Sequence, residues 1–120
     1  MNLPANIVVS GKAALQALWS DTATVTREVD NEEEQTTETQ TVYASISCHL
    51  VQKNAPTLDT REAAALTEPV FTLEVDTAVI LKDGDAVTVQ HNGHTFNGLA
   101  GLPFHRTFCN AVPLSGVEIA

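Results

Sequence analysis

The sequence has few aromatic residues, few cysteines and no long apolar segment. Phe, Trp and Tyr make up 5% of its 120 residues, so a core has to be built from Val, Leu, Ile and Ala, which gives only marginal stability. Cys48 and Cys109 are too few for a disulfide scaffold, which favours reduced thiols and a cytoplasmic setting. No run approaches the roughly 18 apolar residues of a membrane span. Lys12 also interrupts the first apolar stretch, so we expect neither a membrane partner nor a secretory signal.

Positive charge is scarce as well. Six basic residues stand against 15 acidic ones, for a net charge of −9. Stable binding to a phosphate backbone needs clustered Lys and Arg that displace counterions. The basic residues are instead scattered singly, at Lys12, Arg27, Lys53, Arg61, Lys82 and Arg106. The negative charge either keeps the protein soluble or forms a surface that DNA can pass without being held, because like charges repel.

The patterns of common enzymes and metal sites are missing too. The sequence has no Gly-x-Ser-x-Gly elbow, phosphate-binding loop, dinucleotide fingerprint, Cys-x-x-Cys or His-Glu-x-x-His. Cys48 and His49 would point to opposite faces of a strand, so they cannot share a metal ion. The carboxylates cluster at Glu32–Glu34 in a polar segment, whereas a catalytic carboxylate needs burial or a defined neighbour. We therefore expect no catalytic residue, no metal and no cofactor.

Most of the chain alternates polar and apolar residues with the period of two that is typical of β-strands. Strands are predicted at Asp21–Val29, Thr41–Val51, Val70–Val75, Ala86–Gln90, Thr95–Leu99 and Phe104–Val112. In the second strand the apolar side would carry Val42, Ala44, Ile46, Cys48 and Leu50. Asn92-Gly93 is a strong hairpin signal, and Gly84 supplies the positive φ of a turn. The pattern predicts a mainly β fold, a small antiparallel β-barrel or sandwich of six to seven strands.

Two segments flank this β domain, which we expect over residues 21–112. In the first, residues 1–20, Ser10 is placed to cap a short helix from Gly11 to Trp19. This helix would pack either on the domain's own core or, with Trp19 as an anchor, on a neighbouring subunit. After Pro113, residues 113–120 are predicted to be a free tail.

Two polar segments interrupt the strand pattern. Residues 30–40 have no apolar side chain to bury and are predicted to be a mobile hairpin loop. This loop would be either a solvated tip or a segment that orders on assembly. Residues 52–68 form a longer excursion that contains Pro56. Loops of this length are uncommon in a compact domain and are usually functional or disordered.

The order of these elements resembles a known family. A first strand is followed by an acidic hairpin, a second strand leads into the long polar loop, and a Lys-Asp-Gly-Asp turn precedes a short hairpin and a closing strand. The segments concerned are Asp21–Arg27, Val42–Leu50, Phe71–Val75, Ile80–Val89, His91–Phe96 and the strand that carries His105. Over roughly residues 21–112, this order is similar to that of the head-closure (stopper) proteins in the head-to-tail connector of long-tailed bacteriophages.

The resemblance implies a structural virion protein of the phage neck, made in the cytoplasm of the bacterial host. Copies of the protein would form an oligomeric ring between the portal or adaptor protein and the tail-completion or tail-tube protein. The ring would retain the packaged double-stranded DNA without sequence-specific binding and would provide the surface for tail attachment. The alternatives are a neighbouring tail-completion or adaptor protein of the same neck, or a standalone β binding module.

The resemblance also implies roles for the two polar segments. The long loop would project into the channel and hold back the genome. Its candidate gating residues are Gln52, Lys53, Asn54, Ala55, Pro56, Thr57, Leu58, Asp59, Thr60, Arg61 and Glu62. The acidic hairpin would face an adjoining ring. The candidate partner-interface residues are Trp19, Glu32, Glu33, Glu34 and Glu38.

Overall fold

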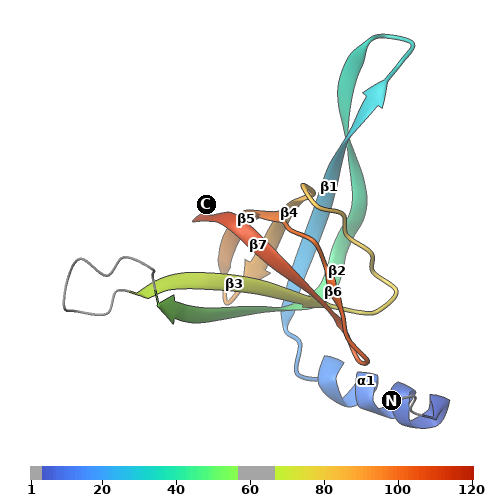
Figure 1. Ribbon diagram of the computed structural model, residues 1–120, viewed down its shortest axis with the longest axis vertical. Helices are drawn as coiled ribbons and strands as arrows, with labels where there is room; N and C mark the ends of the chain where they lie inside the picture. Colours follow the sequence, from blue (N-terminus) through green and yellow to red (C-terminus); the bar gives the residue numbers. More distant parts are fainter. Residues whose placement is uncertain (1–3, 57–66) are drawn as a thin grey trace.

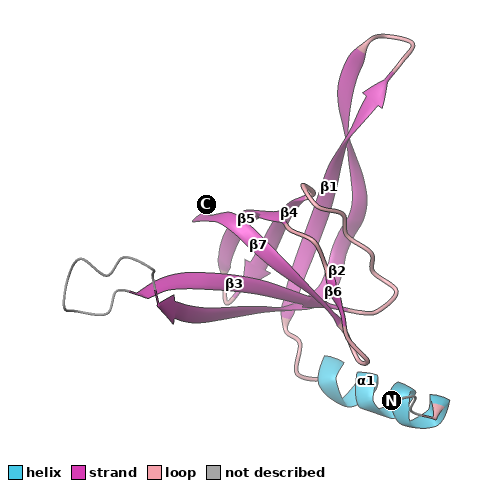
Figure 2. Cartoon of the chain, in the orientation of Figure 1, coloured by secondary structure: helices cyan, strands magenta, loops and turns pink. Residues whose placement is uncertain are grey.

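The computed structural model describes residues 4–56 and 67–120. It contains one short helix followed by seven strands (Figures 1 and 2). These elements are α1 (Ala5–Gln16), β1 (Asp21–Asn31), β2 (Thr36–Pro56), β3 (Thr67–Val75), β4 (Ala86–His91), β5 (His94–Ala100), β6 (Phe104–His105) and β7 (Asn110–Ile119).

The strands form one antiparallel sheet in the order β3-β2-β1-β4-β5-β7-β6, and β3 also pairs with β7. This last pairing closes six of the strands into a ring, while β6 pairs with β7 alone among the described strands. Closure matters because an open sheet edge exposes unpaired N–H and C=O groups. The predicted mainly β fold of six to seven antiparallel strands is confirmed.

The core inside the ring is aliphatic. Its fully buried members are small or branched side chains, namely Ala23, Val25, Cys48, Leu50, Leu73, Val75, Leu81, Val87, Val89, Ala100 and Val112. The aromatic side chains Tyr43, Phe71 and Phe96 pack against this cluster but are only partly buried. The expectation of a core built from Val, Leu, Ile and Ala is thus confirmed for Val, Leu and Ala in the described part of the chain, whereas Ile46 is only partly buried and Cys48 joins the cluster.

The alternation predicted for Thr41–Val51 is interrupted by a β-bulge. Ala23 pairs with Ile46 and Val25 with Tyr43, so that two residues of β2, Ala44 and Ser45, stand opposite Thr24. Ser45 takes a positive φ of 50°. Beyond the bulge Tyr43 packs on the core in place of Ala44, which is exposed. The predicted inward position of Ala44 is wrong, because an extra residue in a strand moves the side chains next to it to the other face. A second register shift, between Val25 and Thr26 of β1, follows directly.

The turn signals of the second half are confirmed. Asn92 and Gly93 have φ values of 49° and 78° in the two-residue turn between β4 and β5, and Gly84 has a φ of 94°. Positive φ at both central residues is the geometry that matches the twist of a hairpin.

The prediction of a free tail after Pro113 is wrong. β7 continues through Pro113 to Ile119 and pairs first with β3 and then with β5. Proline lacks an N–H, but its carbonyl still accepts the Gly101 N–H at 2.7 Å, so the ladder continues. The predicted strand Phe104–Val112 is instead divided, since the Arg106 N–H donates to the Cys109 carbonyl at 2.9 Å in a turn between β6 and β7.

The helix also has other bounds than predicted. Ser10 lies inside α1, and the Pro4 carbonyl begins it by accepting the N–H groups of Ile7 and Val8. Pro4 marks this start because proline is tolerated at the first turn but breaks a helix interior. None of the helix residues is buried, whereas Trp19, which follows the helix, is 9% exposed.

Three contacts hold α1 beside the sheet. Gln16 donates to the Asp76 carboxylate at 2.6 Å, and the Lys12 ammonium donates to the Thr77 hydroxyl. A Cβ atom at Gly11 would lie 2.5 Å from the Phe108 ring, so only glycine lets the helix approach this closely. The helix is therefore attached to the segment after β3 and to the turn before β7.

The core predicts a clear contrast between two leucines. Leu73 is fully buried and joins β2, β3 and β7, so Leu73→Ala is expected to lower the unfolding free energy by about 2–5 kcal/mol through the cavity it leaves. Leu102 is 78% exposed, and Leu102→Ala is the matched control with a change below about 0.5 kcal/mol. Urea denaturation measures both, and equal losses in the two variants would contradict this core assignment.

Candidate assembly interface

The hairpin of β1 and β2 extends well beyond the closed sheet (Figure 1). β4 pairs with β1 only over Thr22–Thr26, whereas the β1–β2 ladder continues to the pair of Asn31 with Thr36. Residues 28–40 therefore form a two-stranded projection, which we call the acidic arm. Its tip is the turn 32–35, with Gln35 at a φ of 53°.

The predicted mobile loop over residues 30–40 is wrong, since these residues are mostly paired strand. Thr36, Thr37 and Thr39 favour an extended backbone, and the ladder satisfies the polar groups without any core. The sequence pattern missed the strands because both faces of the arm meet solvent, which removes the apolar period.

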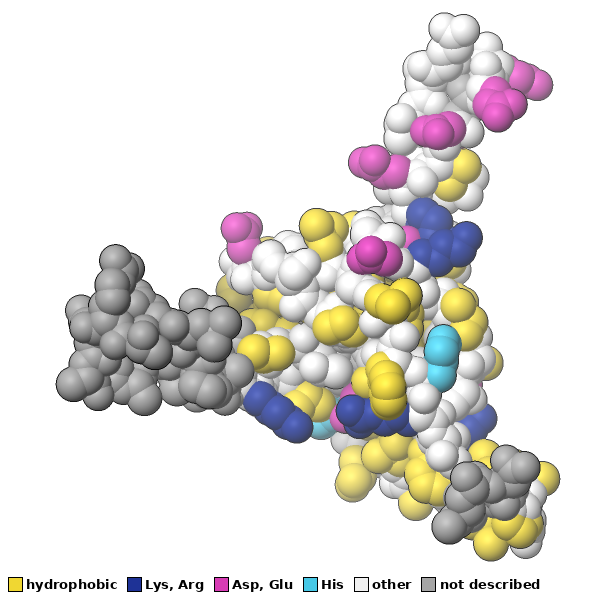
Figure 3. Space-filling model, in the orientation of Figure 1, with side chains coloured by type: hydrophobic (Ala, Val, Ile, Leu, Met, Phe, Trp, Pro, Cys, Tyr) yellow, Lys and Arg dark blue, Asp and Glu magenta, His cyan; other side chains and the backbone are white. Residues whose placement is uncertain are grey.

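The arm carries a dense negative charge (Figure 3). The range 28–40 contains no Lys or Arg, and its carboxylates are Glu28, Asp30, Glu32, Glu33, Glu34 and Glu38. The structure thus brings the four glutamates predicted as interface residues together on one exposed element. The fifth candidate, Trp19, is separate from them and is buried within the chain, so it is not an exposed anchor.

A second ribbon extends from the ring where β2 and β3 continue past β7. β3 pairs with β7 over Phe71–Val75, while its ladder with β2 runs on to the pair of Pro56 with Thr67. The predicted loop therefore does not begin at Gln52, because Gln52 to Pro56 belong to β2. The other gating candidates, Thr57, Leu58, Asp59, Thr60, Arg61 and Glu62, lie outside the described residues.

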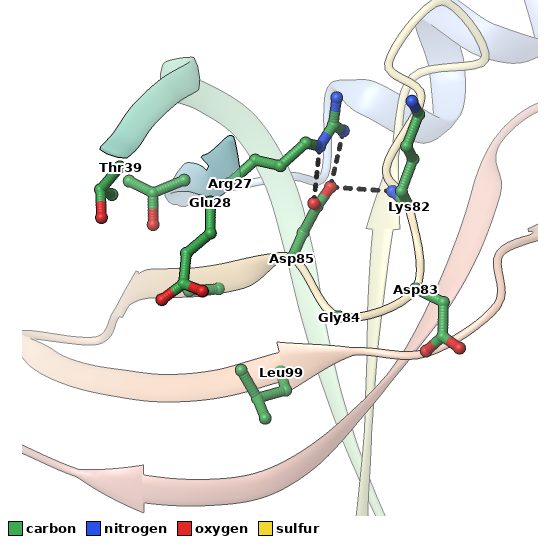
Figure 4. Close-up of a pocket in the computed structure, with 10 residues that line it drawn as sticks. Arg27, Glu28, Thr39, Lys82, Asp83, Gly84, Asp85 and Leu99 are labelled. Carbon is green, nitrogen blue, oxygen red and sulfur yellow. Dashed lines mark hydrogen bonds and ion pairs between the residues drawn. The ribbon is translucent and has the colours of Figure 1, made fainter. Parts of the chain in front are cut away.

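A groove of about 580 Å³ lies at the base of the acidic arm, and we call it the arm-base groove. It is formed where the arm meets the turn between Leu81 and β4, and Leu99 of β5 completes it (Figure 4). The lining residues are Thr26, Arg27, Glu28, Thr39, Lys82, Asp83, Gly84, Asp85, Ala86 and Leu99.

A bidentate ion pair fixes the groove. Nε and Nη2 of Arg27 each donate to one oxygen of Asp85 at 2.8 Å, and the Lys82 backbone N–H donates to the same carboxylate at 2.8 Å (Figure 4). The hydrogen bonds from Arg27 hold the pKa of Asp85 below its usual value, although burial opposes this shift. The same hydrogen bonds raise the pKa of Arg27. Asp85 is 2% exposed, so the pair acts as a fixed brace between the arm and the ring.

Sequence reasoning assigned no role to Arg27 or Asp85, although one signal was present. Arg27 follows Ala23 and Val25 on the face of β1 that enters the core. A charged residue on such a face needs a partner of opposite charge. Its partner Asp85 is 58 residues away in the sequence, and only the closed topology brings the two together.

Several other buried polar groups connect elements of the fold. The Asp21 carboxylate accepts the Leu50 N–H and contacts His91 Nδ1, each at 2.8 Å, and so joins β1 to β2 and β4. The Cys109 thiol donates to Glu74, and burial raises the pKa of the Cys48 thiol to about 12. Among the described residues, no group of three His, Cys, Asp or Glu side chains is placed to hold a metal ion.

No protein-family model matches the chain, and no curated protein matches its sequence. Within residues 4–56 and 67–120, the one helix is too short to span a membrane. The features that bear on function are therefore the arm, the groove and the second ribbon.

The brace predicts a pH-dependent loss of stability. Asp85→Asn is expected to lower the unfolding free energy at neutral pH by about 1–3 kcal/mol, because it weakens a charged hydrogen-bonded pair. The folded pKa of Asp85 is lowered, so this stabilisation is present above roughly pH 4, the ordinary aspartate pKa, and is lost as the pH falls through the folded pKa.

The difference between wild type and Asp85→Asn should therefore shrink in acid. Denaturant unfolding between neutral pH and pH 3 measures it, with Asp83→Asn in the same turn as the exposed control. A difference that stays constant over this range would show that the brace does not titrate as described.

Proposed function

We propose that this protein is a structural subunit of the neck of a long-tailed bacteriophage and forms a ring that retains packaged DNA and receives the tail. The observation that carries the proposal is the acidic arm. It extends from a small closed sheet as exposed ladder, and it adds no residue to the core. A chain with a marginal core gains from ordered projections of this kind when they contact other subunits.

Two further features support an assembly role. The edges of the acidic arm and of the second ribbon lie beyond the closed ring, and open strand edges bind other chains by adding strands. Large apolar side chains are exposed in several segments, with Leu18 at 75%, Leu102 at 78% and Phe104 at 66%. Contact with other subunits would cover such residues.

Electron microscopy of assembled particles tests the proposal. A ring at the neck that is labelled by an antibody or a tag on this chain is the expected result. The height of the ring between portal and tail separates a stopper from a neighbouring adaptor or tail-completion protein. Particles with a complete neck from which this chain is absent would refute the proposal.

The second ribbon gives a test of DNA retention. The pair of Pro56 with Thr67 is the last rung of the β2–β3 ladder, so a short Gly-Ser turn in place of residues 57–66 should close the hairpin without loss of the core. Heads assembled with this variant are expected to package DNA and then lose it, as measured by the ratio of filled to empty heads.

The matched control is a variant in which the residues of positions 57–66 are kept but placed in a scrambled order, so that length and composition stay the same. The unfolding free energy of both variants should equal that of wild type. A shortened chain that folds normally and still retains DNA would exclude a gating role for this segment.

A further inference from the structure

The arm-base groove presents two cationic groups on one side. The Asp85 carboxylate accepts hydrogen bonds from two of the three guanidinium nitrogens of Arg27. The third nitrogen also carries N–H groups that can donate. The third nitrogen of Arg27 and the Lys82 ammonium point to the same side, away from Asp85 (Figure 4). Glu28 and Asp83 point to the opposite side. This side of the groove is therefore suited to a carboxylate, and the brace fixes one of its two donors in advance.

The acidic arm supplies carboxylates of the matching charge. Glu32, Glu33 and Glu34 occupy the exposed turn at the tip of the arm, which projects away from the closed sheet (Figure 1). A DNA duplex fits the groove poorly, because its phosphates would have to approach past the carboxylates of the arm that stands beside it.

The tip cannot reach the groove of its own chain. From Arg27 to Asn31 the strand rises roughly 14 Å, and the tip lies farther still from the base. The paired ladder between Arg27–Asn31 and Thr36–Gln40 also prevents the arm from folding back. Contact between tip and groove therefore has to occur between two copies of the chain.

We propose that the tip of the acidic arm of one copy docks on Arg27 and Lys82 in the arm-base groove of the next copy. This inference deepens the proposed function and rests on it, since it names the contact that joins subunits. Tip and groove are different surfaces, so the contact is head-to-tail and each copy offers one of each. Such contacts close into a ring when the rotation between copies permits it.

A charge exchange tests the contact. Lys82→Glu removes one cation but keeps the backbone N–H that binds Asp85, and Glu32→Lys/Glu33→Lys/Glu34→Lys reverses the tip. Sedimentation velocity at low salt over increasing protein concentration measures self-association. Each variant alone is expected to associate on the order of tenfold more weakly than wild type. Lys82→Glu places a carboxylate where the tip would dock, and the reversed tip brings lysines against Arg27 and Lys82.

An equal mixture of the two variants should recover association, since each tip then meets a groove of opposite charge. Arg106→Glu, a reversal in the exposed turn between β6 and β7, is the matched control and should associate as wild type does. Added salt should weaken the wild-type contact and the mixture alike.

A wild-type chain that stays monomeric at every concentration, or a Lys82→Glu variant that associates normally, would overturn the inference. So would a mixture that associates no better than its components. The proposed function is judged separately, by the ring in particles. If the neck ring is present in wild-type particles and also forms from the Lys82→Glu chain, the proposed function stands and only this contact is refuted.

Discussion

The pairing of β3 with β7 closes the sheet, and the other features of the molecule depend on this closure. Leu73 and Val112 face each other across it, and both are fully buried. The rings of Tyr43, Phe71 and Phe96 pack against the core of Val, Leu and Ala, but they are only partly buried and do not cover an open side. The helix does not cover one either, because none of its residues is buried. Apolar burial in this protein therefore requires that the strands surround the core on all sides.

Closure also decides where the chain can bind other chains. Inside the ring each strand is hydrogen-bonded to a neighbouring strand on both sides. The main strand edges with unpaired backbone groups, among the described strands, therefore lie where two paired strands extend beyond the ring. The acidic arm is the longest described part of this kind. The Arg27–Asp85 brace lies at its base and holds it to the ring. An arm that is fixed in this way loses little conformational entropy when it docks, which favours a stable contact over a transient one.

Sequence patterns predicted the structure where one face of a strand is buried. Alternation located β4 and β5 because Val87 and Val89 face the core, and Asn92-Gly93 specified their turn. Alternation did not predict the strands of the arm, because both faces of the arm are exposed to solvent. It failed also beyond Pro113, where ladder pairing with β3 and β5 outweighed the missing N–H of proline. The β-propensity of the residues and the period of the apolar positions are properties of one segment alone. These segments are strands because they pair with neighbouring strands.

The candidate site was foreseen only in part, for the same reason. The glutamates of the arm stand out as a cluster in the sequence, so their exposure and grouping could be predicted. The groove could not, because Arg27, Lys82 and Leu99 come from three distant segments. The Ser45 bulge left no signal either, since a bulge is defined by the register against a partner strand.

The distribution of charge bears on how the protein works. Of the 15 acidic residues, six lie in residues 28–40, which leaves nine against the six basic residues in the rest of the chain. The net charge of −9 thus belongs mainly to one projection and not to the surface as a whole. A charge that served solubility alone would be effective anywhere on the surface. Concentrated on a braced arm, it instead fits the proposed docking on Arg27 and Lys82 of the next copy, and it disfavours contact of the arm with nucleic acid.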